Sequence, residues 1–141
     1  MTMSVVDRLM KHYEHFDPAL IESLEEIYDK NIVFQDPIHK VEGLPDLRRY
    51  FGGLMEGLEE CRFAFNDRIE VPGKVVLVWT MTYRHARLKG GKTLTLDGSS
   101  HLKVDEKVVY HRDYYDVGTM LYEHVPVLGF VIRQIKSRLE G

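Results

Sequence analysis

Cysteine is nearly absent from this chain of 141 residues, since Cys61 is the only one. A single cysteine excludes an internal disulfide and any metal site built from several thiolates. Basic residues are not in excess either: the formal net charge is −3, so we expect no nucleic-acid partner. The sequence also lacks a signal-peptide core and the run of about 20 apolar residues that a membrane span requires. We therefore expect a cytoplasmic protein with no metal and no cofactor.

What the chain does contain is typical of one globular domain. Apolar residues make up 44% and charged residues 29% of the sequence, which is enough apolar material for a sizeable core. Apolar residues at helical spacing then predict three helices in the N-terminal part. Ser4 can cap the first helix, and Asp17 with Pro18 can begin the second. Pro45 opens the third helix, after a short strand over residues 31–36.

Beyond residue 62 the apolar period changes from helical spacing to two. This alternation predicts four strands, over residues 62–71, 75–87, 92–104 and 108–116. Short turns between them indicate an antiparallel meander with one apolar and one polar face. The predicted fold class is therefore α+β: a cone-shaped, strongly curved antiparallel sheet wrapped around three N-terminal helices.

The last segment predicts an added C-terminal helix, which Pro126 interrupts or restarts. We accordingly divide the chain into a domain over residues 1–117 and a helical extension over residues 118–141, packed on the same domain. For this tail we expect packing over the pocket mouth or a sister subunit rather than contact with a membrane surface.

Strand register decides which polar residues face the interior. If the last hairpin turns about residues 105–107 without interruption, Ser100 faces Arg112 and both lie on the inner face. Tyr114 and Asp116 would follow Arg112 on that face. A guanidinium there is costly unless it has an anionic partner. The candidate partners are Asp36, at the inner end of the first strand, and Asp116. The plainer alternative is that Arg112 reaches solvent at the rim of the cone, with Asp116 as a surface partner.

The same register assigns a polar outer face to the sheet. Residues expected there are Thr82, Arg84, His101, His111, Asp113 and Tyr115. His101 and His111 would be neighbours, but the spacing supplies no further ligand, so we predict no metal site. We expect instead that this face forms a homodimer.

The order helix–helix–"NIVFQDPIHKVEG"–helix–meander resembles the nuclear transport factor 2-like, or SnoaL-like, superfamily, which has the ketosteroid isomerase fold. The resemblance covers residues 5 to 116, and the tail resembles an extension of some bacterial members. It implies that Asp36, ahead of Pro37, is the general base and that Tyr13 donates a hydrogen bond to a developing oxyanion. Ser100 takes the place of the neutral carboxylic acid that completes the oxyanion hole in ketosteroid isomerase.

The resemblance leaves several functions open. The first is a pocket enzyme, similar to ketosteroid isomerases or polyketide cyclases, that moves a proton next to the carbonyl of a small apolar ligand. Its catalytic residues would be Asp36, Tyr13, Arg112 and Ser100. Its ligand-binding residues would be Tyr28, Phe51, Trp79, Met81, Tyr83, Leu102, Tyr114 and Asp116. The second is an epoxide hydrolase-like enzyme using Asp36, Arg112 and Asp116. The third is a non-catalytic module that docks as a dimer or binds a ligand, with Arg112 holding a carboxylate.

Overall fold

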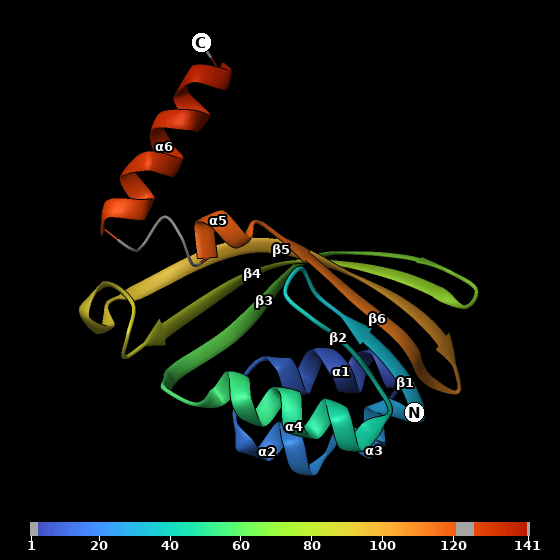
Figure 1. Ribbon diagram of the computed structural model, residues 1–141. Coiled ribbons are helices and arrows are strands. Elements are labelled where there is room, and N and C mark those ends of the chain that lie inside the picture. Colours follow the sequence, from blue (N-terminus) through green and yellow to red (C-terminus); the bar gives the residue numbers. More distant parts are fainter. Residues whose placement is uncertain (1–2, 121–125, 141) are drawn as a thin grey trace.

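A curved six-stranded sheet covers four short helices on its concave side, in a computed structural model that describes residues 3–120 and 126–140 (Figure 1). The helices are α1 (Val5–Tyr13), α2 (Pro18–Glu22), α3 (Leu24–Ile27), α4 (Leu44–Met55), α5 (Val117–Met120) and α6 (Pro126–Glu140). The strands are β1 (Tyr28–Gln35), β2 (Lys40–Glu42), β3 (Leu58–Val71), β4 (Lys74–His85), β5 (Thr93–Asp105) and β6 (Lys107–Tyr115). The predicted α+β class with a curved sheet is confirmed.

The sheet has the order β2-β1-β6-β5-β4-β3. Strands β3 to β6 form the expected antiparallel meander, whereas β1 pairs with β6 in parallel. This parallel pairing brings the end of β1, and with it Asp36, next to the C-terminal half of β6. The site described below is built at this junction.

The N-terminal helices begin where the sequence predicts. Ser4 forms a capping box with Asp7 on α1, and the Asp17 side chain caps α2 ahead of Pro18. The predicted second helix, which helical spacing would carry from Pro18 through Tyr28, is wrong in its extent: it breaks at Ser23 into α2 and α3, and the chain becomes strand at Tyr28. The predicted apolar side of this segment still faces the core, because Leu20, Leu24 and Ile27 are buried and Ile21 packs against them partly buried.

A β-bulge in β3 exchanges the two faces of the strand from Asp67 to its C-terminal end. Phe65 pairs with Trp79 but Asp67 pairs with Val78, so one extra residue lies between them. Beyond the bulge Ile69 becomes 56% exposed, although alternation places it on the apolar face. Arg68 points to the helices instead.

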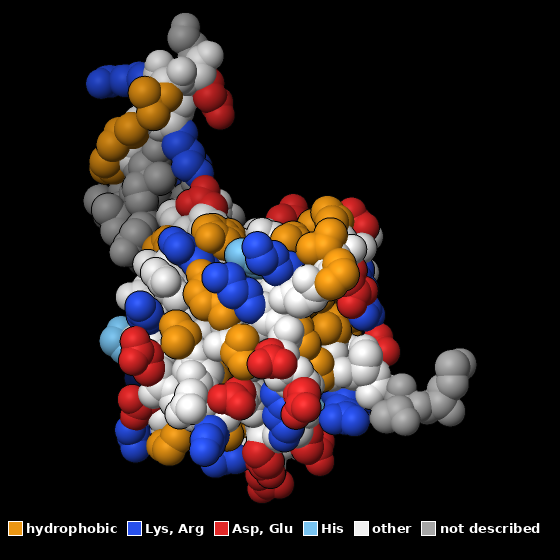
Figure 2. Space-filling view, turned by 90° about the vertical axis from the view of Figure 1, so that its right-hand side faces the viewer, with side chains coloured by type: hydrophobic (Ala, Val, Ile, Leu, Met, Phe, Trp, Pro, Cys, Tyr) orange, Lys and Arg blue, Asp and Glu red, His pale blue; other side chains and the backbone are white. Residues whose placement is uncertain are grey.

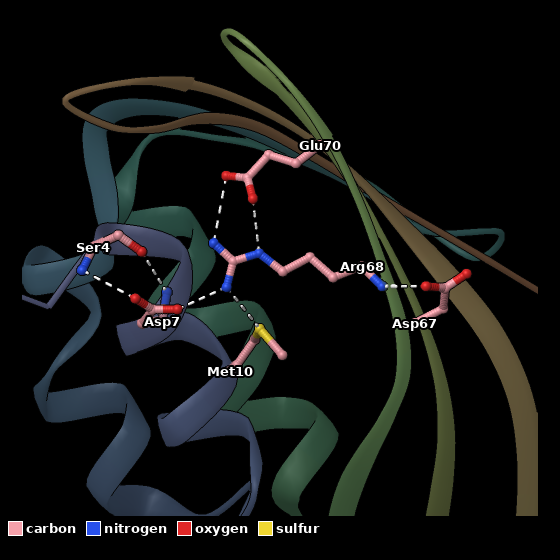
Figure 3. A network of polar contacts seen from close by, with 6 residues as sticks. All are labelled: Ser4, Asp7, Met10, Asp67, Arg68 and Glu70. Atoms are coloured by element: carbon pink, nitrogen blue, oxygen red, sulfur yellow. Dashed lines mark hydrogen bonds and ion pairs between the residues drawn. The ribbon is translucent and has the colours of Figure 1, made fainter.

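Arg68 fastens the sheet to the start of α1 (Figure 3). Its guanidinium bonds Asp7 at 2.7 Å and Glu70 at 3.0 Å, and it also approaches the Met10 sulfur. Hydrogen bonds from Arg68 hold the pKa of the Asp7 carboxyl below its ordinary value. The contact therefore joins the start of α1 to the C-terminal half of β3.

A second bulge, on β6, overturns the predicted register of the last hairpin. Val104 pairs with Val108, but Lys103 already pairs with Tyr110, so Val109 is an extra residue. An extra residue exchanges the two faces of the strand beyond it. Ser100 therefore faces Asp113, where the uninterrupted register predicts Arg112.

This exchange corrects six placements. Arg112 and Tyr114 lie on the outer face, where the guanidinium stacks on the Tyr114 ring at 4.8 Å. Three residues expected on the outer face lie instead on the inner one: His111, Asp113 and Tyr115. The sixth, Asp116, caps α5 by accepting hydrogen bonds from Thr119, and is exposed to solvent.

Helix α6 projects from the body of the molecule (Figure 1), and its Lys136 bonds Asp116. Figure 2 shows hydrophobic side chains along one side of this helix; Val131, Ile135 and Leu139 are exposed. Residues 121–125 of the predicted tail helix lie outside the described residues. Within the described ranges, no helix has the length and apolar character needed to cross a bilayer.

Candidate functional site

A cavity of about 370 Å³ opens between the concave face of the sheet and helices α1, α4 and α5. Its wall is mostly aromatic and aliphatic, with a small number of polar groups. The apolar wall includes Phe16, Phe34, Phe51, Trp79, Met81 and Met120. The acidic groups are Asp36, Glu56 and Asp113, and the hydroxyls are those of Tyr13, Tyr83 and Tyr115. An apolar hollow with a few converging polar groups is the usual form of a small-molecule site.

Asp36 lies in the turn after β1 and is 7% exposed. Its Oδ1 accepts hydrogen bonds from the backbone N–H groups of Ile38 and His39, at 2.8 and 2.9 Å. Its Oδ2 accepts from the Tyr50 hydroxyl of α4 at 2.5 Å. The Asp-Pro sequence thus does form a turn, but the turn holds a buried carboxylate whose two oxygens both have donors.

Asp113 is bound differently. Its Oδ1 accepts from the Ser100 hydroxyl at 2.5 Å and lies 2.6 Å from His111 Nε2. Among the described residues, none bonds its Oδ2, and the side chain is 13% exposed where it lines the cavity. One carboxylate oxygen is therefore fixed by two neighbours while the other is free to meet a ligand.

Behind the cavity wall, a line of hydrogen bonds connects Asp113 to Tyr13. His111 Nδ1 lies 2.8 Å from the Tyr28 hydroxyl, which lies 2.6 Å from the Tyr13 hydroxyl. An ionised Asp113 accepts only, so His111 Nε2 carries a proton in this arrangement. Tyr28 and His111 are each 1% exposed, and of the three Tyr13 alone reaches the cavity wall. Burial holds the pKa of both tyrosines well above the ordinary value, so both keep their protons.

Tyr115 adds a further hydroxyl on the cavity wall. Burial, followed by the charges of Asp36 and Asp113, raises the pKa of Tyr115. Its hydroxyl bonds no other described residue. Tyr115 is therefore a neutral donor available to a ligand oxygen.

Trp79 and Ser100 form the floor beneath Asp113. The indole Nε1 of Trp79 donates to the Ser100 hydroxyl at 2.9 Å, and Ser100 passes a hydrogen bond on to Asp113. The indole lies directly over Gly98 on β5, where an added Cβ would come within 2.3 Å of the ring. A glycine is needed here to let the ring lie flat against the strand.

The predicted site residues fall into three groups. On the cavity wall are Tyr13, Asp36, Phe51, Trp79, Met81 and Tyr83. Buried behind the wall are Tyr28, Ser100 and Leu102. Outside the cavity are Arg112, Tyr114 and Asp116, so the structure does not assemble the Asp36–Arg112–Asp116 set of an epoxide hydrolase.

Sequence reasoning missed Asp113, Tyr115, His111 and the Asp36 partner Tyr50. Alternation correctly grouped residues 111, 113 and 115 on one face but chose the wrong face. The cost of burying an unpaired guanidinium was the signal against that choice. The bulged register avoids the cost and gives Asp113 and His111 partners on β1 and β5.

A family model for the SnoaL-like domain matches residues 9–111. The chain belongs to the SnoaL-like family. No curated protein matches it significantly in sequence. Solved structures share the fold at low identity. One, named as a provisional SnoaL-like polyketide cyclase from Jannaschia sp. CCS1, is 15% identical, with 83% of this chain and 86% of that one covered and a TM-score of 0.72.

Two further solved structures of similar fold were determined with small molecules bound. TerC, with polyporic acid, is 18% identical over 82% of this chain and 94% of that chain, with a TM-score of 0.70. A protein with a ketosteroid isomerase-like fold from Catenulispora acidiphila, with trimethylamine, is 10% identical over 86% and 92%, with a TM-score of 0.73. At these identities the likeness establishes the fold alone. For this SnoaL-like chain, the family supports a role in small-molecule binding or in cyclase- or isomerase-like chemistry.

Proposed function

We propose that the cavity binds a small, largely apolar carbonyl compound and that Asp113 moves a proton at the carbon next to the carbonyl. The observation that carries this proposal is the free Oδ2 of Asp113 on an apolar wall, with Oδ1 fixed by Ser100 and His111. When hydrogen bonds fix one oxygen of a carboxylate, the other oxygen has a defined position from which to take a proton. Asp36 is less suited to this role than the sequence predicts, because donors occupy both of its oxygens.

The step balances without a co-reactant. Asp113 Oδ2 takes the proton from the carbon next to the carbonyl, and the C–H electron pair becomes the C=C bond of an enolate. The negative oxygen accepts a hydrogen bond from the neutral hydroxyl of Tyr115, and Tyr13 is the second candidate donor. Where the ligand has a neighbouring C=C bond, return of the proton from Asp113 to the far carbon of the dienolate gives isomerisation. Attack of the enolate carbon on a second carbonyl forms a C–C bond, and the alkoxide so formed takes the proton from Asp113, which completes cyclisation.

The crystallisation of TerC with polyporic acid supports the use of this fold for small organic ligands. The cavity of this chain suits a ligand of that kind, since carbon-rich side chains from β1, β4, α1 and α4 surround its few polar groups. A ligand recognised here would be mostly apolar, with one oxygen directed at the hydroxyls and one acidic C–H directed at Asp113.

Hydrogen–deuterium exchange on β-tetralone, a ketone with acidic C–H groups, tests the proposal in deuterated water by NMR. We expect the wild-type protein to catalyse the exchange and Asp113→Asn to lose about a hundredfold or more, the usual contribution of a general base. Asp97→Asn is the matched control, because that carboxylate lies on the outer face of β5 and accepts from Thr80. It is expected to retain the wild-type rate.

Asp36→Asn separates the two buried carboxylates. We expect it to keep most of the exchange activity, since Asn can still accept from the two backbone N–H groups. Full activity in Asp113→Asn together with loss in Asp36→Asn would assign the base to Asp36 and overturn the proposal.

A further inference from the structure

The buried line Tyr13–Tyr28–His111 reaches Asp113, and the proposal above uses its two ends: His111 fixes Asp113 Oδ1, and Tyr13 is the second candidate donor. Its hydroxyls and imidazole are linked at 2.6 and 2.8 Å, and a hydroxyl has only one proton to donate. Donation along the line must therefore run in one direction at a time. The direction is set at the His111 end, because Nδ1 either accepts from Tyr28 or, when protonated, donates to it.

With a neutral His111, each hydroxyl of the line donates its proton toward the imidazole. Nε2–H donates to Asp113, so Nδ1 accepts from Tyr28, and the Tyr28 oxygen accepts from Tyr13. The Tyr13 proton then points away from the cavity. Of the two hydroxyls named above, Tyr115 alone can then donate to a ligand oxygen.

With a doubly protonated His111 the line reverses. Nδ1–H donates to the Tyr28 oxygen, and the Tyr28 proton goes to the Tyr13 oxygen. The Tyr13 proton then has no acceptor within the line. Because Tyr13 lines the cavity, its proton can be donated to a ligand oxygen. The added positive charge is paired, since Asp113 Oδ1 lies 2.6 Å from Nε2.

We infer that His111 is a positioning residue whose protonation redirects the Tyr13 hydroxyl proton from Tyr28 to the ligand oxygen, which makes Tyr13 a second hydrogen-bond donor to the ligand. This inference rests on the proposed function for the nature of the ligand, a carbonyl compound. At low pH the site then offers the ligand oxygen two hydrogen-bond donors, Tyr115 and Tyr13. At higher pH it offers Tyr115 alone.

The surroundings of His111 leave few other groups to set this equilibrium. The Tyr13 ring lies 6.1 Å and the Phe34 ring 4.7 Å from the imidazole, and Leu102 of β5 is the residue directly opposite. The titratable groups that face it are Asp113 on its own strand, Tyr28 on β1 and Tyr13 on α1, with Cys61 of β3 beyond Tyr13. Both tyrosines stay neutral because burial raises the pKa of each. The paired Asp113 carboxylate is thus the charge that acts on His111.

Fluorenone labelled at its carbonyl carbon is a suitable probe, because it has no exchangeable C–H next to the carbonyl. Its carbonyl carbon NMR signal moves with each hydrogen bond that the oxygen accepts. The pH series runs from about 5 to 9, and we expect a step in this signal wherever nitrogen NMR of the same complex shows His111 changing its protonation state. We expect affinity to rise toward low pH by roughly two- to tenfold, the value of about one neutral hydrogen bond.

Tyr28→Phe distinguishes reversal of the hydrogen bonds along the line from a direct effect of the positive charge on His111. It removes the link, so Tyr13 can donate to the ligand at every pH, and we expect the carbonyl signal to stay at its low-pH position. Tyr13→Phe should hold the signal at its high-pH position, and His111→Gln should remove the step because an amide does not titrate in this range. Tyr114→Phe, on the outer face, is the matched control and should keep the wild-type step.

Three results would overturn the inference. They are a step that persists in Tyr28→Phe, a flat carbonyl signal while His111 titrates, and a His111 that keeps one protonation state across the range. None of these measurements depends on turnover. Loss of β-tetralone exchange in Asp113→Asn combined with a flat fluorenone signal would reject the line reversal and leave the proposed function standing.

Discussion

Replacing Gly98 by alanine tests how tightly the floor of the site is packed. The new Cβ would lie 2.3 Å from Trp79 Cη2 and under 3.0 Å from two more ring carbons, so the indole must move. Trp79 is 2% exposed, and its Nε1 bonds Ser100, so the ring cannot move without cost. Overpacking a core typically costs about 1–3 kcal/mol, and a lost neutral hydrogen bond costs about 1 kcal/mol more. Reduced freedom of the unfolded chain returns about 0.5 kcal/mol.

We therefore expect Gly98→Ala to lower the free energy of unfolding by about 2–3 kcal/mol in urea titration. Trp79 is the only tryptophan, so its emission reports on the displaced ring directly. Gly52→Ala is the control: no atom lies within 4 Å of an added Cβ on this α4 residue, and we expect stabilisation of about 0.5–1 kcal/mol. A Gly98→Ala protein as stable as wild type, with unchanged emission, would refute the packing argument. Adding Trp79→Phe, which shortens the ring, should recover part of the loss.

Two further predictions concern the thiol and the link between sheet and helix. Burial raises the pKa of Cys61 to about 12, so we expect the native thiol to react with a disulfide reagent at least about a hundredfold more slowly than in denaturant; equal rates would contradict its burial. Because Arg68 lowers the pKa of Asp7, this carboxylate stabilises the fold above its ordinary pKa of about 4, and the contribution is lost as pH falls through the lowered value. Asp7→Asn should cost about 0.5 kcal/mol at neutral pH, since both side chains are partly exposed, and the deficit should shrink in acid. A deficit that is unchanged in acid, or that persists in an Arg68→Met background, would contradict this.

Much of the fold followed from apolar periodicity and from cap residues. Ser4 and Asp17 begin helices as predicted, and the four strands of the meander lie within a few residues of their predicted limits. These features are local, because a cap or an alternating strand is determined by residues a few positions apart. The position of Asp36, at the end of a buried strand and held by a turn, was predictable for the same reason.

The residues of the site were less predictable, because two bulges change which face of the sheet a side chain lies on without changing the local alternation of apolar and polar residues. One extra residue at Val109 sends Asp113 rather than Arg112 into the cavity, and one extra residue before Asp67 turns Arg68 toward α1. Neither bulge is marked by a glycine or a proline. What selects them is the pairing of polar groups across the fold: Asp113 gains Ser100, and Arg68 gains Asp7. Such pairs join residues far apart in the sequence, so no local pattern contains them.

The central claim is that the bulge on β6 places Asp113, not Arg112, on the inner face. Cross-strand proton–proton contacts in NMR test it most directly, because directly opposite residues of an antiparallel pair lie closest together. We predict backbone contacts between Ser100 and Asp113 and between Leu102 and His111. Backbone contacts between Ser100 and Arg112 and between Leu102 and Tyr110 would show an uninterrupted hairpin and contradict the claim.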